Sequence, residues 1–133
     1  MTVGCPEFLS ALSPGLCAPV DHYCERLSGA WDAEPVNAVT NVAFLFAAAG
    51  ASYMLDSVRD AQPRKLLALL TYLMALVGLG SILFHTLGTR WAEWGDVVPI
   101  TLFLGVYLWI AFAKFLHFPA AWCAALIVVL VGA

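Results

Sequence analysis

The chain has 133 residues, of which 62% are hydrophobic and 11% charged, and its mean hydropathy is +0.88. Soluble domains carry about 25% charged residues, so this composition excludes an ordinary soluble protein and indicates an integral membrane protein. The net charge of −3 is small and spread along the chain, which excludes the basic stripe of a nucleic-acid-binding protein. We therefore expect an all-α, polytopic transmembrane helical bundle.

Residues 1–34 form a mixed N-terminal segment that we expect to lie outside the membrane. The segment lacks a basic stretch followed by an apolar run, so it does not read as a signal peptide. Cys5, Cys17 and Cys24 lie close together in it and suit a disulfide in an oxidising compartment, with the pairing left open. Cys123 lies in an apolar run, where a free buried thiol is the ordinary interpretation.

Residues 35–133 form a transmembrane domain with three predicted full spans, at about 35–55, 65–86 and 96–114. Pro35 is well placed at a helix start, and a crossing needs about 20 apolar residues. A fourth run, 119–133, offers only 15 residues. We expect an incomplete fourth span and hence an N-terminal fragment of a larger membrane protein; a short protein with a partial last helix is the alternative.

The basic residues predict the orientation. Arg59, Arg64 and Lys65 lie around the connection between the first two spans, and Lys114 ends the third span. Cytoplasmic loops carry an excess of Lys and Arg, so we expect the N-terminus outside and the first connection inside.

Three polar residues, Ser81, His85 and Asp96, lie in or beside the predicted spans. Ser81 and His85 are four residues apart and share one helix face. Asp96 follows His85 by eleven residues, so a ten-residue turn would return it to about the same membrane depth. Ionisable groups are costly there and indicate a functional site. The ordinary alternatives are a packed histidine, a serine bonded to its own helix and an aspartate that only caps a helix.

The N-terminal segment carries a second group of polar residues, Asp21, Glu25 and Glu34. Carboxylates from a short loop are the hard oxygen ligands that calcium takes. Glu34 directly before Pro35 also suits a helix N-terminus, through the macrodipole. The spacing does not match an EF-hand, and on spacing alone a solvated acidic loop is the favoured interpretation.

Four stretches of the chain resemble the alkaline ceramidase family: Asp21–Glu25, Glu34–Asn41, Gly80–Thr86 and Asp96–Pro99. The chain looks most like the bacterial members, within a superfamily of seven-helix hydrolases, and the resemblance runs over residues 21–109. It implies seven helices around a zinc ion held by three histidines. One of these comes from the second helix and two from an H-x-x-x-H pair on the seventh.

The resemblance implies a role for each of the three polar residues. His85 would be the second-helix zinc ligand, Asp96 would orient or deprotonate the attacking water, and Ser81 would hydrogen-bond that water or the developing oxyanion. The chain departs from the family in having no H-x-x-x-H. His22 precedes the first span and His117 lies at the far end of the third, so neither replaces the pair.

The resemblance also implies that Asp21, Glu25 and Glu34 form a calcium-binding loop beside the zinc site. Here too the chain departs from the pattern. The spacing from Glu25 to Glu34 is shorter than in the eukaryotic members, and Leu27 stands where those members offer an amide oxygen. Calcium is therefore less firmly implied than zinc.

The function implied is a membrane-embedded, zinc-dependent amide hydrolase that cleaves ceramide-like N-acyl sphingolipids into a sphingoid base and a fatty acid. Its substrate would be a lipid from the bilayer of the bacterial inner membrane, and the 133 residues alone would be inactive. One alternative is a receptor-like or lipid-sensing protein of the same superfamily. Another is a membrane scaffold in which Gly78, Gly80 and Gly88 allow close helix packing.

Overall fold

The computed structural model describes residues 5–132, and within this range it contains helices and no strand. This confirms the predicted all-α class. The elements in chain order are α1 (Glu7–Leu12), the 3-10 helix η1 (Pro14–Cys17), α2 (Pro35–Thr40), α3 (Val42–Leu55), α4 (Ala61–Leu87), α5 (Arg90–Ile110), the π-helix η2 (Ala111–Phe115) and α6 (Ala120–Gly132).

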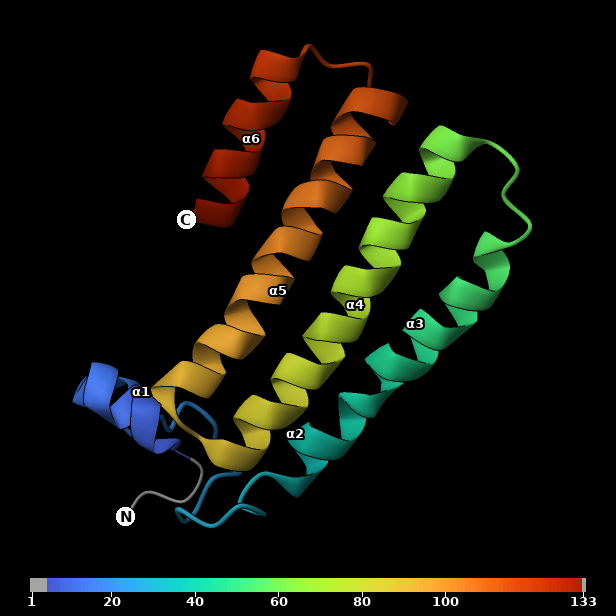
Figure 1. Cartoon of the computed structure of the whole chain (residues 1–133). Coiled ribbons are helices and arrows are strands. Elements are labelled where there is room, and N and C mark those ends of the chain that lie inside the picture. The colour runs from blue at the N-terminus through green and yellow to red at the C-terminus, as the bar shows by residue number, and fades with distance from the viewer. Residues whose placement is uncertain (1–4, 133) are drawn as a thin grey trace.

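Within residues 5–132, three helical stretches are long and apolar enough to cross a membrane: Pro35–Leu55, Ala61–Leu87 and Arg90–Phe115. This confirms the prediction of three full spans. The stretches run alternately up and down, and each packs beside the next along the chain (Figure 1). α6 lies beside α5 and is shorter, as the sequence predicts for a fourth run; its predicted last residue, Ala133, lies outside the described residues. The membrane boundaries of the spans stay predictions.

The first stretch is broken at Asn41, between α2 and α3. Thr40 Oγ1 donates to the carbonyl oxygen of Val36 at 2.8 Å, and Asn41 Nδ2 donates to that of Asn37 at 2.8 Å. Side chains that bond back to the preceding turn compete with the helical ladder and bend a helix. The helix is therefore interrupted at Asn41, and α2 and α3 are separate elements of one stretch.

The turn between α4 and α5 is much shorter than the sequence predicts. Only Gly88 and Thr89 separate the two helices, where a ten-residue turn was expected. Gly88 adopts the left-handed conformation, with φ +57°, and its N–H donates to the carbonyl oxygen of Phe84 at 2.8 Å, as glycine does at helix ends. Asp96 consequently lies inside α5, so the interpretation of Asp96 as a helix cap is wrong.

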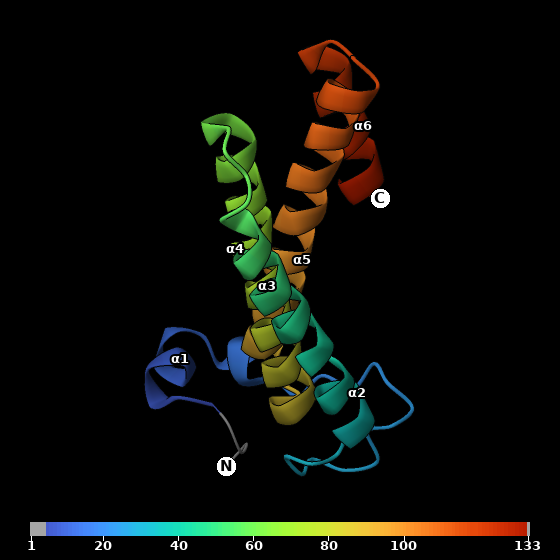
Figure 2. The same cartoon turned by 90° about the vertical axis from the view of Figure 1, so that its right-hand side faces the viewer.

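Glycines allow the spans to approach closely. A Cβ atom on Gly80 would lie 2.0 Å from the carbonyl oxygen of Gly95, so the α4 and α5 backbones touch at this point. A Cβ atom on Gly78 would lie 2.9 Å from Leu45 Cδ2 on α3. These contacts confirm that Gly78 and Gly80 allow close packing. Beyond the crossing, α4 and α5 diverge toward their far ends (Figure 2).

The N-terminal segment is fastened to the α4–α5 turn. The N–H of Val20 donates to the carbonyl oxygen of Gly88 at 2.8 Å, and the N–H of Arg90 donates to that of Ala18 at 3.0 Å. Val20 also packs with Phe84 and Ala92 in a small buried core. The segment therefore covers the end of the bundle where α4 meets α5.

The cysteines separate into one disulfide and two free thiols. Cys5 and Cys17 are bonded, with Cα atoms 5.6 Å apart, which resolves the pairing that the sequence left open. Cys24 is free and exposed. Cys123 is free and fully buried, as predicted.

Candidate active site

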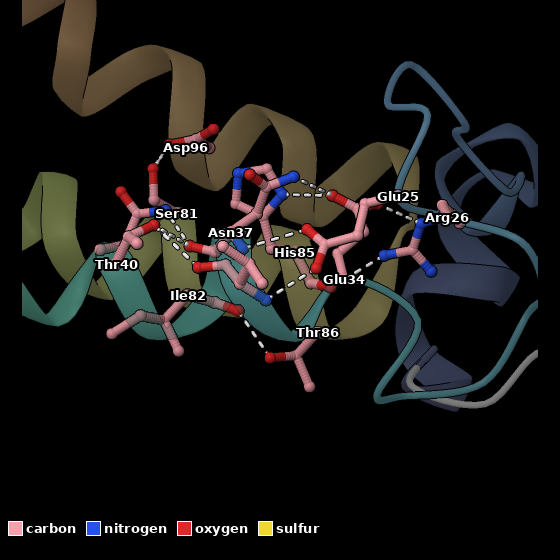
Figure 3. A network of polar contacts seen from close by, with 12 residues as sticks. Glu25, Arg26, Glu34, Asn37, Thr40, Ser81, Ile82, His85, Thr86 and Asp96 are labelled. Atoms are coloured by element: carbon pink, nitrogen blue, oxygen red, sulfur yellow. Dashed lines mark hydrogen bonds and ion pairs between the residues drawn. The ribbon is translucent and has the colours of Figure 1, made fainter.

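Ser81, His85 and Asp96 lie together at the covered end of the bundle, and all three side chains are buried. Ser81 and His85 are one turn apart on α4, and the close crossing at Gly80 and Gly95 brings Asp96 of α5 beside them. The Ser81 hydroxyl donates a hydrogen bond to Asp96 Oδ1 (Figure 3). The structure thus brings together the three residues that the sequence singles out, while their chemical roles stay predictions.

His85 is held on two sides by the N-terminal part of the chain. Its Nδ1 lies 2.5 Å from Glu34 Oε2, and the ring of Tyr23 meets the imidazole edge-on with 4.9 Å between ring centroids. Because an ionised carboxylate can only accept, we assign the Nδ1–H tautomer, which leaves the lone pair on Nε2. Metal-ligating histidines are commonly oriented in this way by a carboxylate.

Glu34 is the centre of the polar network in Figure 3, and its side chain is only 1% exposed. Arg26 Nε donates to its Oε1, and Asn37 Nδ2 donates to its Oε2 at 3.3 Å. Burial raises the pKa of this carboxyl group, but hydrogen bonds with its three partners and the Arg26 charge lower it by more. The pKa of Glu34 therefore lies below its usual range, and the group is an ionised acceptor.

The three acids of the predicted calcium loop do not converge on one point. Glu25 accepts hydrogen bonds from the backbone N–H groups of Val36 at 2.7 Å and Asn37 at 3.1 Å, at the start of α2. Glu34 is engaged by other partners, and Asp21 is exposed. A calcium site needs about six to eight oxygen ligands around one centre, so these residues do not fit the ion as they are arranged.

A cavity of about 440 Å³ opens beside Ser81, His85 and Asp96. Its wall is completed by side chains from the N-terminal segment and the three spans: Tyr23, Asn41, Phe44, Met74, Val77, Ile100, Phe103 and Leu104. Most of these are apolar, so the cavity has a polar end at the three candidate residues and an apolar end further along the bundle. That division suits a molecule with one polar group and a long apolar chain.

The described residues do not bring together a complete set of ligands for a zinc ion. No group of three histidine, cysteine or acidic side chains within residues 5–132 is placed to hold a metal ion. His22 Nε2 lies 3.0 Å from Glu93 Oε1, and His117 follows η2, away from the α4–α5 turn. His85 fits the part of a single ligand, because its ring is fixed by Glu34 and lines the cavity. In the family that the chain resembles, the other two zinc ligands come from an H-x-x-x-H pair.

Three residues of the network were not predicted as site residues: Tyr23, Arg26 and Asn37. Arg26 is a single basic residue within an acidic loop, which could have indicated an internal ion pair. Tyr23 lies between His22 and Cys24, and no sequence pattern there indicates a buried side chain. Its contact with His85 depends on how the loop folds.

The comparison with protein families agrees with this geometry. The ceramidase family model matches residues 22–133, which is 112 of the 133 residues and includes every member of the network. This match favours the ceramidase interpretation over a receptor-like protein or a scaffold. No curated protein and no solved structure matches the chain. On the strength of the family match and its extent, the chain belongs to the ceramidase family.

Proposed function

We propose that the protein is a membrane-embedded, zinc-dependent amide hydrolase that cleaves ceramide-like N-acyl sphingolipids into a sphingoid base and a fatty acid. Membership of the ceramidase family already indicates a hydrolase acting on an amide bond. The observation that carries the finer proposal is the cavity in which Ser81, His85 and Asp96 meet an apolar wall.

His85 would be one of three zinc ligands in this proposal. When bound, zinc lowers the pKa of water to about 7 and polarises the amide carbonyl. The tautomer favoured by Glu34 leaves Nε2 free to bind the metal, and Tyr23 limits rotation of the ring. The two further ligands are expected from the family's H-x-x-x-H helix.

Asp96 would transfer the proton during the reaction, and Ser81 would stabilise the oxyanion. Asp96 accepts a proton as water attacks the amide carbon, and returns it to the nitrogen as the carbon–nitrogen bond breaks. The Ser81 hydroxyl donates to Asp96 in the resting arrangement. Once Asp96 is protonated, that hydroxyl is released and can donate to the developing oxyanion.

The apolar part of the cavity would receive hydrocarbon from the substrate. Met74 and Val77 lie on α4 before Ser81, and Ile100 and Phe103 lie on α5 after Asp96, so both pairs extend from the polar end toward the middle of the spans. A lipid amide could therefore reach the polar end without leaving the bilayer.

Release of fatty acid from ceramide tests the proposal. We expect a chain that carries the H-x-x-x-H helix to hydrolyse ceramide, to lose activity with a zinc chelator and to recover it when zinc is restored. We expect none from the 133 residues alone, because a catalytic zinc needs about three protein ligands. Turnover that a chelator does not reduce would refute the zinc mechanism, and zinc-dependent turnover by the 133 residues would require another ligand set.

A further inference from the structure

We infer that the Arg26 guanidinium, and not a calcium ion, is the cation that holds the acidic N-terminal loop at the active site, and that Arg26 positions His85 through Glu34. The inference rests on the proposed function only in taking His85 as a zinc ligand. The positive charge that the loop needs is already part of the chain.

The contacts of Arg26 join the loop to both parts of the site. Its Nε donates to Glu34 Oε1, and the other oxygen of the same carboxylate receives the Nδ1–H of His85. Its Nη2 donates to the carbonyl oxygen of His85 at 2.8 Å, near the end of α4. Arg26 thus contacts the backbone of His85 directly and the ring of His85 through one carboxylate.

The position is built around a buried cation. The Arg26 side chain is 7% exposed and that of Glu34 is 1% exposed, so this is an internal ion pair and not a surface one. Carbonyl groups at a helix C-terminus carry partial negative charge, which favours a cation beside them. Arginine suits such a place because its planar group can bond two acceptors at once.

Gly88 leaves the room that the guanidinium needs. A Cβ atom at this position would lie 2.5 Å from Arg26 Cζ and 2.6 Å from Nη1. The short α4–α5 turn, which requires a left-handed residue at Gly88, therefore also provides the space beside Arg26. The turn and the ion pair fit together as one arrangement.

The carboxylate oxygens of Glu25 and Glu34 already have hydrogen-bond partners, so the loop offers no set of oxygens that could coordinate a calcium ion. Glu25 is used by two backbone N–H groups of α2, and Glu34 is shared by Arg26, His85 and Asn37. An added divalent cation at Glu34 would have to displace Arg26 and would be repelled by its charge. We therefore expect calcium to be dispensable for this chain.

Thermal unfolding of the purified protein in detergent, with calcium or with a calcium chelator, tests the first half of the inference. The expected Tm is the same in both conditions. A calcium-dependent rise in the Tm of the wild type would overturn the inference, whatever the variants do.

Substitutions at Arg26 test the second half. Arg26→Ala should lower the Tm by about 10 °C, because it leaves the Glu34 carboxylate buried without its cation. Arg26→Lys should recover part of that loss. The matched control is Arg90→Gln, which removes an exposed arginine at the same end of the bundle and should leave the Tm unchanged.

A double variant and a spectroscopic signature separate positioning from general stability. Glu34→Gln should suppress most of the Tm loss of Arg26→Ala, since it removes the charge that Arg26 neutralises. The ring nitrogen signals of His85 in NMR should report the Nδ1–H tautomer in the wild type and in Arg90→Gln, and a mixture of tautomers in Arg26→Ala. A wild-type Tm and unchanged His85 signals in Arg26→Ala would overturn the positioning role. These readouts do not require catalysis, so a failure of the proposed hydrolysis would be recognised separately.

Discussion

Ser81 and Asp96 face each other across the crossing of two helices, and both side chains are buried. A buried carboxylate must be hydrogen-bonded, and the Ser81 hydroxyl meets part of that need at Asp96. The remaining acceptor capacity of the carboxylate faces the cavity. That incomplete satisfaction suits a group whose work is to accept a proton.

In a chain that also carries the H-x-x-x-H helix, substitution of either partner should reduce hydrolysis while the protein still folds. For Asp96→Asn we expect a loss in kcat of about 10²–10⁴-fold, the usual range for a general base. For Ser81→Ala we expect a loss of about 10²–10³-fold, as for removal of one oxyanion donor. Initial rates of fatty-acid release at saturating ceramide measure both.

Thr86→Val is the matched control for this pair of variants. Thr86 lies on the same helix, and its hydroxyl donates to the carbonyl oxygen of Ile82 at 2.7 Å. Its loss removes a hydroxyl close to the site without touching Ser81 or Asp96, so the rate should stay near that of the wild type. Equal rates for Ser81→Ala and the wild type would remove Ser81 from the mechanism.

Residue-level prediction succeeded where a regular helix fixed the spacing. Ser81 and His85 share a face because any helix places residues four apart on one side. The contact of Glu34 with His85 spans 51 positions, and that of Arg26 with Glu34 lies within an irregular loop. No local periodicity encodes either contact, so the network around Glu34 could not be derived from the pattern of residues.

Among the elements, the crossing of α4 and α5 matters most to the site. At Gly80 the α4 backbone comes so close to the carbonyl oxygen of Gly95 that a side chain has no room. In a membrane, helices pack through such small-residue contacts because lipid supplies no hydrophobic drive between them. The geometry of Ser81 and Asp96 therefore depends on a residue that takes no part in chemistry.

Gly80→Ala should separate α4 from α5 and pull Ser81 away from Asp96. We expect a loss in kcat of about 10²-fold, the usual cost of misplacing reacting groups by about 1 Å, together with a lower Tm. Gly50→Ala is the control, because a Cβ atom at Gly50 would meet nothing within 4 Å on the exposed side of α3. If both variants match the wild type in rate and Tm, the crossing is looser than described.

The elements themselves were largely predictable, and their ends were not. The apolar runs gave three spans, but α4 begins at Ala61 and α5 at Arg90, each before the apolar run it contains. Polar residues such as Arg64 and Glu93 belong to the first turns of these helices. A prediction based on apolar residues therefore places the start of each helix after its true start. This is also why Asp96 was predicted at a span start and lies within a helix.

Across the whole molecule, the N-terminal segment lies at the end of the bundle where α4 meets α5 (Figure 1). The Cys5–Cys17 disulfide belongs to this segment, and the candidate site lies at the same end. Disulfides persist in oxidising compartments, so the Cys5–Cys17 bond agrees with the predicted orientation with the N-terminus outside. The excess of basic residues around the first connection points the same way.

Labelling of Cys24 tests this orientation, because Cys24 is the free, exposed thiol of the chain. A membrane-impermeant maleimide added to intact cells should label the wild type. The double variant Cys24→Ser, Ser57→Cys moves the thiol to the exposed first connection and should be labelled only after the membrane is opened. The opposite pattern would place the N-terminus inside.

Zinc content is the most direct test of the central claim that His85 is a metal ligand of a ceramidase site. In a purified chain that carries the H-x-x-x-H helix, we expect elemental analysis to find about one zinc per chain, consistent with a single three-ligand catalytic site. His85→Ala should lose most of that zinc, while His117→Ala, which changes an exposed histidine away from the site, should keep it. Equal zinc in the wild type and in His85→Ala would contradict the account.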